Sequence, residues 1–206
     1  MKLANWIKCL GDPTITNEEI ILCNKALNWT DLGHDNLDKL MRVSFKKTKF
    51  ADQRKNWQPG TTGECKFCQG NNITEPESLK HVLYECQDTK KCLELTLRVF
   101  GLPKLDEIKI KELILWKFIN SEQNTRNYSK EIVFKTITTL FLCEYLKLRY
   151  SAENSAEMEA KLVVDNILKQ LNIIHTYKPL SSIMRAINTE PLIMRLLVSG
   201  FSPHID

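Results

Sequence analysis

The chain has 206 residues, of which 43% are hydrophobic and 26% are charged, and its net charge is +4. With only seven glycines and seven prolines, this composition excludes a largely disordered chain and is typical of a helix-rich protein that buries a full core. No apolar run reaches the roughly 18 residues of a membrane span or forms the core of a signal peptide, so we expect an intracellular protein without a membrane segment. In that setting seven cysteines indicate reduced thiols and metal ligands rather than disulfides.

Two amphipathic helices are predicted in the first part of the chain. Thr16 and Glu19 form a capping box, and apolar residues at helical spacing continue from it to about Trp29. The second helix begins near Asp35 and runs into a basic stretch. The sequence WQPGTTG at 57–63 then breaks the helical pattern.

Positive charge is concentrated in residues 39–57, where seven lysines or arginines and one aspartate give +6. Aromatic side chains alternate with these cations, a pattern that favours binding of single-stranded nucleic acid by phosphate neutralisation and base stacking. The predicted nucleic-acid contacts are Lys46, Lys47, Lys49, Arg54, Lys55 and Trp57. The alternative is that these cations line a solvated helix face and loop.

The segment CKFCQGNNITEPESLKHVLYEC, residues 65–86, contains four soft ligands at metal-binding spacing. Two, twelve and four residues separate Cys65, Cys68, His81 and Cys86, which is a spacing that suits a tetrahedral zinc ion. Four protein ligands leave no coordination position open to water. One structural Zn²⁺ is therefore expected, rather than a catalytic one.

A short helix is predicted in the second half of this segment. Thr74, Pro76 and Glu77 form a helix-start signature, so His81 should lie on a helix that runs to about Cys86. Two residues five apart on a regular helix point about 140° from each other. Cys86 is therefore expected where the helix ends or loosens.

Further helices are predicted after the metal-ligand segment, and strand signals are scarce. Asp88 is expected to cap a helix that Gly101 and Pro103 end. Later helices are predicted at 106–119, 132–150, 158–174 and after Thr189-Glu190-Pro191. The polar sequence SEQNTRNYSK at 121–130 is the best candidate for a linker. We therefore predict a mainly α fold with an embedded Cys-Cys-His-Cys zinc site. Its parts are a helical segment 1–120, a linker 121–130 and a C-terminal helical segment 131–206 that can pack with the first as one domain.

The residues around the ligands carry a family resemblance. In EPESLKHVLYEC, Glu77 and Ser78 lie ahead of His81, and apolar residues follow it before Cys86. This arrangement resembles the zinc-binding segment near the C-terminal end of reverse transcriptases from non-LTR (LINE-type) retrotransposons. The resemblance covers residues 65–86 and implies metal ligation by the four ligands. It departs from that family in a long gap after Cys68 and in Gln87, where a proline is common.

Two other kinds of site are disfavoured. A ββα zinc finger has similar ligand spacing, but its core positions hold Asn72 and Ser78 here. Residues 49–53, KFADQ, are superficially similar to the aromatic-Ala-Asp-Asp turn of polymerases, but Gln53 stands in place of the second aspartate. Two-metal phosphoryl transfer needs converging carboxylates, and the chain has no Asp-Asp pair and no HExxH motif. We therefore expect no enzymatic activity.

These observations favour a non-catalytic, zinc-stabilised domain that binds RNA or DNA, in either the nucleus or the cytoplasm. The alternative is a zinc-stabilised helical scaffold that binds a protein partner through its C-terminal helices. Cations gathered on one face would favour nucleic acid, whereas an exposed apolar patch on the C-terminal helices would favour a protein partner.

Overall fold

The computed structural model describes residues 54–56, 58–60, 62–69, 74–78, 81–104, 125–149 and 156–199. Helices dominate this part of the chain, and it contains no strand beyond an isolated bridge. The prediction of a mainly α fold is confirmed. The helices predicted within residues 1–53 and at 106–119 lie outside the described residues.

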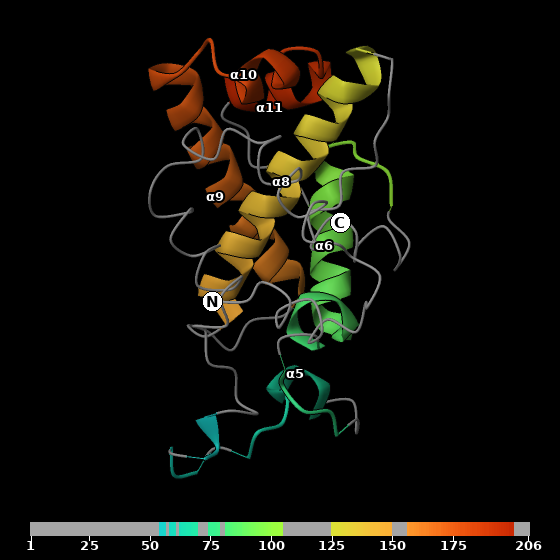
Figure 1. Ribbon diagram of the computed structural model, residues 1–206, viewed down its shortest axis with the longest axis vertical. Helices are drawn as coiled ribbons and strands as arrows, with labels where there is room; N and C mark the ends of the chain where they lie inside the picture. The colour runs from blue at the N-terminus through green and yellow to red at the C-terminus, as the bar shows by residue number, and fades with distance from the viewer. Residues whose placement is uncertain are drawn as a thin grey trace, which may run out of the picture.

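Three long helices form the body of the molecule and run roughly along its long axis (Figure 1). They are α6 (Gln87–Val99), α8 (Thr125–Arg149) and α9 (Ala156–Tyr177). Both α6 and α8 pack against α9. The start and end of α9 agree with the helix predicted at 158–174 to within a few residues.

Short elements lie at the two ends of this body (Figure 1). One end carries α10 (Ser182–Ile187), which packs on α8, and α11 (Pro191–Ser199), which packs on α9. The opposite end carries α5 (Lys66–Gln69), and the π-helix η2 (His81–Glu85) joins it to α6. The predicted metal-ligand segment therefore lies at one end of the molecule.

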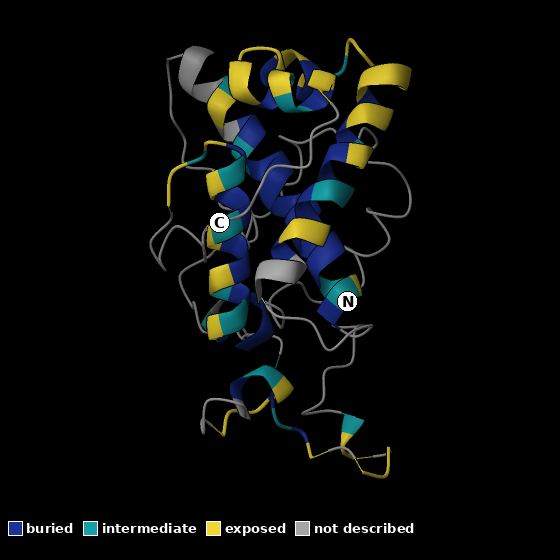
Figure 2. Cartoon of the chain, turned by 180° about the vertical axis from the view of Figure 1, so that it is seen from behind, coloured by how far each residue is buried: buried dark blue, intermediate teal, exposed yellow. Residues whose placement is uncertain are grey.

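The middle of α8 is buried on every side. Residues 135–145 are all buried, including the polar side chains of Lys135, Thr136 and Glu144, as expected for a central helix without a single apolar face. Figure 2 shows buried residues through the interior of the bundle and exposed ones along its outer sides. Residues 125–130, which the sequence analysis placed in a linker, form the first turns of α8. They contain no Gly or Pro, and packing of the rest of the helix outweighs their polarity.

The helix that follows the metal-ligand segment shares a core with the C-terminal helices. One cluster of buried apolar residues extends from Leu83 to Leu197 and includes Cys92 and Cys143. These two thiols are core residues. None of the helices in the described residues is long and apolar enough to cross a membrane.

The end of α6 follows the prediction closely. Gly101 adopts a φ of 66°, which glycine tolerates best, and its amide donates to the Arg98 carbonyl while the Leu102 amide donates to the Leu97 carbonyl. These two bonds form a Schellman motif. A Cβ atom at Gly101 would lie 2.6 Å from a methyl carbon of Leu192 in α11. The glycine therefore ends α6 and also allows α11 to approach it closely.

Candidate metal centre

The first two ligands are held by a tight turn that leads into α5. Cys65 precedes α5 and Cys68 lies within it, and the Cys68 amide donates to the Cys65 carbonyl at 3.1 Å. An antiparallel bridge pairs Glu64 with Pro76, and the Cys65 amide donates to the Glu75 carbonyl at 2.8 Å. The bridge therefore holds this turn against the chain that leads to the other two ligands.

The helix start predicted at Thr74 is wrong. Residues 74–78 are not helical, because Pro76 pairs with Glu64 in the bridge. The helical turn η2 begins at His81, whose amide donates to the Ser78 hydroxyl at 3.1 Å. Ser78 thus caps the turn. A capping box is a local signal, and here a contact between distant residues overrides it.

The remaining two ligands lie at either end of η2. The Cys86 amide donates to the His81 carbonyl at 2.8 Å, which is the i→i+5 bond of a π-turn. A turn of this width brings residues five apart toward the same side, whereas a regular helix would separate them by about 140°. The expectation that the helix loosens at Cys86 is confirmed. Cys86 is also the N-cap residue of α6, so Asp88 lies in the first turn rather than at the predicted cap.

The four ligand atoms form a cluster of tetrahedral size. All of them lie within 4.8 Å of one another. The Sγ atom of Cys86 is 3.8 Å from that of Cys65 and 3.9 Å from that of Cys68, and the Cys68 Sγ is 3.4 Å from His81 Nε2. A regular tetrahedron with zinc–ligand bonds of about 2.3 Å to sulfur and 2.0 Å to nitrogen has edges of about 3.5 to 3.8 Å. The residues therefore fit a zinc ion in size and in donor type.

The cluster is buried and its thiols differ in acidity. All four ligands are buried. A hydrogen bond with Cys65 lowers the pKa of Cys86, the charge of Arg149 lowers it further, and it falls to about 3. The same hydrogen bond and burial raise the pKa of Cys65, and burial raises the pKa of Cys68. The Cys65 and Cys86 sulfurs therefore share a hydrogen bond beside a cation, and a bound metal ion must displace the protons that the ligand thiols still carry.

A buried arginine, which the sequence analysis did not identify, contacts the cluster. Arg149, the last residue of α8, is 0% exposed and donates from Nη2 to the Cys65 Sγ at 2.9 Å. Burial lowers the pKa of this guanidinium, but attraction to Tyr145, Cys86, Cys65 and Glu77 outweighs burial and raises it, so Arg149 stays charged. No sequence signal points to it, because it lies 84 residues from Cys65.

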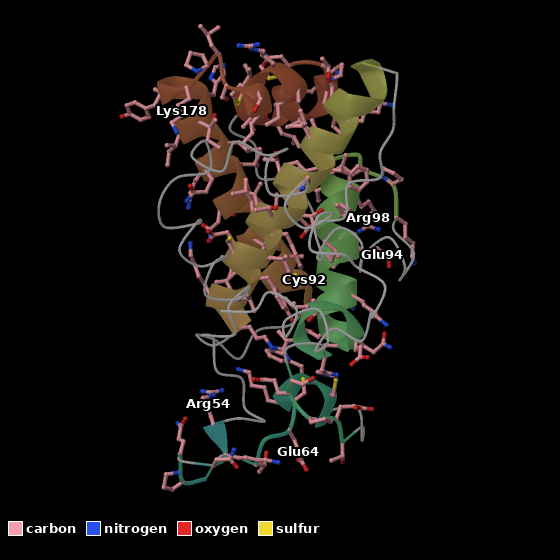
Figure 3. The ribbon with its side chains drawn as sticks, viewed as in Figure 1. Arg54, Glu64, Cys92, Glu94, Arg98 and Lys178 are labelled. Atoms are coloured by element: carbon pink, nitrogen blue, oxygen red, sulfur yellow. The ribbon has the colours of Figure 1, made fainter. Side chains whose placement is uncertain are left out.

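Two of the six predicted nucleic-acid contacts fall in the described part of the chain. Arg54 lies at the end of the molecule that carries α5 (Figure 3), and its Nη2 is 3.8 Å from a carboxylate oxygen of Glu77. Lys55 is exposed beside it. Lys46, Lys47, Lys49 and Trp57 lie outside the described residues. Arg54 is therefore linked through Glu77 to Arg149, which contacts the metal-ligand cluster.

Comparison with models of known protein families, with curated proteins and with solved structures gave no match. The resemblance to retrotransposon reverse transcriptases therefore rests on the residues of the motif itself.

Proposed function

We propose that Cys65, Cys68, His81 and Cys86 hold one structural zinc ion. The observation that carries this proposal is the cluster of ligand atoms: all four lie within 4.8 Å of one another, and three pairs lie 3.4 to 3.9 Å apart, close to the edges of a zinc-centred tetrahedron. Three thiolates and one imidazole select zinc over the hard cations magnesium and calcium, which prefer oxygen ligands. Because protein atoms fill all four positions, the zinc has a stabilising role and offers no site for a substrate.

The purified chain is expected to contain one zinc per molecule by elemental analysis. Cys68→Ser should lower that content severalfold, because a hydroxyl is a poor zinc ligand beside thiolates. Cys92→Ala is the matched control, since it removes a buried thiol outside the cluster and should leave one zinc per chain. A wild-type protein without zinc, or an unchanged content in Cys68→Ser, contradicts the assignment.

We propose that this zinc-stabilised domain binds RNA or DNA without catalysis. The concentration of positive charge in residues 39–57 and the resemblance of residues 65–86 to a reverse transcriptase segment support the proposal. The contact of Arg54 with Glu77, which lies in the chain between the second and third ligands, and the exposure of Lys55 are compatible with an interface at this end of the molecule. The Glu77 carboxylate already balances part of the charge of Arg54, so Lys55 is the stronger phosphate-contact candidate of the two.

Binding is expected to weaken steeply with salt. Phosphate contacts release condensed counterions, which gives a log–log slope of roughly −0.7 per contact on a single strand. Replacing Lys46, Lys47 and Lys49 with alanine should flatten the slope by about 2 and weaken binding to all sequences alike. Titration of labelled RNA and DNA at several salt concentrations measures both effects.

The control for this experiment removes the same charge elsewhere. Lys161, Lys169 and Arg195 are exposed on α9 and α11, and their joint replacement by alanine should leave the slope close to that of the wild type. If the Lys46, Lys47 and Lys49 variant keeps the wild-type slope, the basic stretch is a solvated surface and does not contact nucleic acid.

A second function is favoured by exposed apolar side chains near the other end of the molecule. Ile173 and Tyr177 lie four residues apart on α9, hence on one face, and Leu180 follows in the next turn. They are 51%, 79% and 78% exposed. Such a strip favours a protein partner, so the scaffold function becomes the leading one if nucleic-acid binding fails the salt test.

A further inference from the structure

The guanidinium of Arg149 joins the metal ligands to the helical body. Its Nη2 lies 2.9 Å from the Cys65 Sγ and 3.5 Å from a Glu77 oxygen. Its Nη1 lies 2.7 Å from the Tyr145 hydroxyl and 3.8 Å from the Cys86 Sγ. One side chain at the end of α8 therefore contacts two ligand sulfurs, Glu77 next to the Glu64–Pro76 bridge, and Tyr145 of α8 itself.

The geometry suits a guanidinium and no other cation. The carbon Cζ of Arg149 lies 4.5 Å from the ring centre of Phe67, which is in α5, and 5.8 Å from that of Tyr145. A planar fork can donate in two directions while its face lies on an aromatic ring. A lysine ammonium at the same place would keep the charge, but it would lose the second donor direction and the stacking.

The charges of the loaded centre require such a cation. A zinc ion with three thiolates and a neutral histidine carries a net charge of −1, and here that charge is buried. A buried charge without a partner is costly. Arg149 balances it, while Glu77, which is also buried, lies between Arg149 and the half-exposed Arg54. The charges thus alternate in sign and sum to zero along the series formed by the loaded centre, Arg149, Glu77 and Arg54.

We propose that Arg149 is the charge-balancing and positioning residue of the metal centre, and that through it metal loading stabilises the end of α8. The proposal rests on the proposed metal function. Outer residues that contact ligands commonly change metal affinity by about 10- to 100-fold. Coupling between two events is reciprocal. If Arg149 strengthens metal binding, metal binding must in turn stabilise the packing of Arg149 and of the helix turn that carries it.

The test compares Arg149→Met and Arg149→Lys with the wild-type chain. Zinc affinity is measured by competition with a chromophoric chelator, and thermal unfolding is followed with and without zinc. We expect Arg149→Met to weaken zinc binding by about 10- to 100-fold and to reduce the gain in Tm that zinc gives. Arg149→Lys should lie between Arg149→Met and the wild type. Cobalt substitution should still give the spectrum of three-sulfur tetrahedral coordination in both variants, because neither removes a ligand.

The control is Lys130→Met, which removes an exposed cation from the same helix and should leave zinc affinity and the zinc-dependent gain in Tm unchanged. The proposal is overturned if Arg149→Met binds zinc with wild-type affinity. It is also overturned if the substitution lowers Tm by the same amount with and without zinc, because Arg149 would then contribute only to packing. If Arg149→Met does not fold, Arg149→Lys provides the test, and wild-type zinc affinity in that variant overturns the proposal. A wild-type chain without zinc would instead refute the metal function itself.

Discussion

Removal of zinc is expected to expose the amides of residues 62–69 and 74–78 to hydrogen exchange, while the amides of α9 stay protected. The apolar cluster around residues 62–69 consists of Cys65, Cys68 and Cys86, with Phe67 packed against them, so the ligands themselves form the core there. Leu83 of η2 belongs instead to the core of the helical body. Structural zinc contributes an apparent binding free energy of about 10 to 16 kcal/mol in small zinc-binding peptides. No other contact among the described residues of this segment can replace a stabilisation of that size. Exchange followed by mass spectrometry before and after addition of a strong chelator measures the effect.

Chelator already saturated with zinc is the control for this experiment and should change nothing. Cys68→Ser should show the rapid exchange without any chelator. If residues 62–69 exchange at the same rate with and without metal, the segment is held by the bridge and its packing, and the zinc has no structural role.

Phe141→Ala is expected to lower the free energy of unfolding by about 3 to 5 kcal/mol, the usual range when a large aromatic side chain is removed from a core. Phe141 is 0% exposed, and its ring stacks on that of Tyr145 with 5.3 Å between centres. The substitution leaves a cavity in the middle of α8 and removes the ring that supports Tyr145. Urea denaturation followed by circular dichroism measures the loss.

The matched control is Tyr177→Ala, because this aromatic side chain is 79% exposed and its removal should change stability by less than about 0.5 kcal/mol. Equal losses in the two variants would contradict the assignment of α8 as the central helix. A smaller effect of Phe141→Ala than of Tyr177→Ala would contradict it as well.

The sequence predicted which four residues the fold brings into one cluster that could hold a metal ion, because metal coordination imposes spacing and spacing is visible along a chain. Helix ends that depend on one residue were also predictable, as at Gly101, where only the backbone freedom of glycine suits the turn. Local signals failed where a distant contact competes with them. Thr74 begins a capping signature, yet Pro76 pairs with Glu64 in a bridge, so no helix begins there.

The role of Arg149 could not be predicted from the sequence, for a related physical reason. A cation near the C-terminal end of a helix is ordinary, since it interacts favourably with the helix dipole. Only the folded arrangement brings it against Cys65 and buries it. The first turns of α8 were missed because polar residues at 125–130 give no periodic pattern, although nothing in them prevents a helix.

A segment whose core consists of its own metal ligands has a stability that depends on the concentration of free zinc. For a zinc-loaded centre, each tenfold rise in free zinc above the dissociation constant adds about 1.4 kcal/mol to the stability of the folded segment. The folded fraction of residues 62–69 and 74–78 would then follow zinc availability, and the last turn of α8 would follow it through Arg149. Helix α9, in contrast, keeps a stability set by the apolar core of the helical body. The same molecule would respond to scarcity of the ion at one end and remain unaffected at the other.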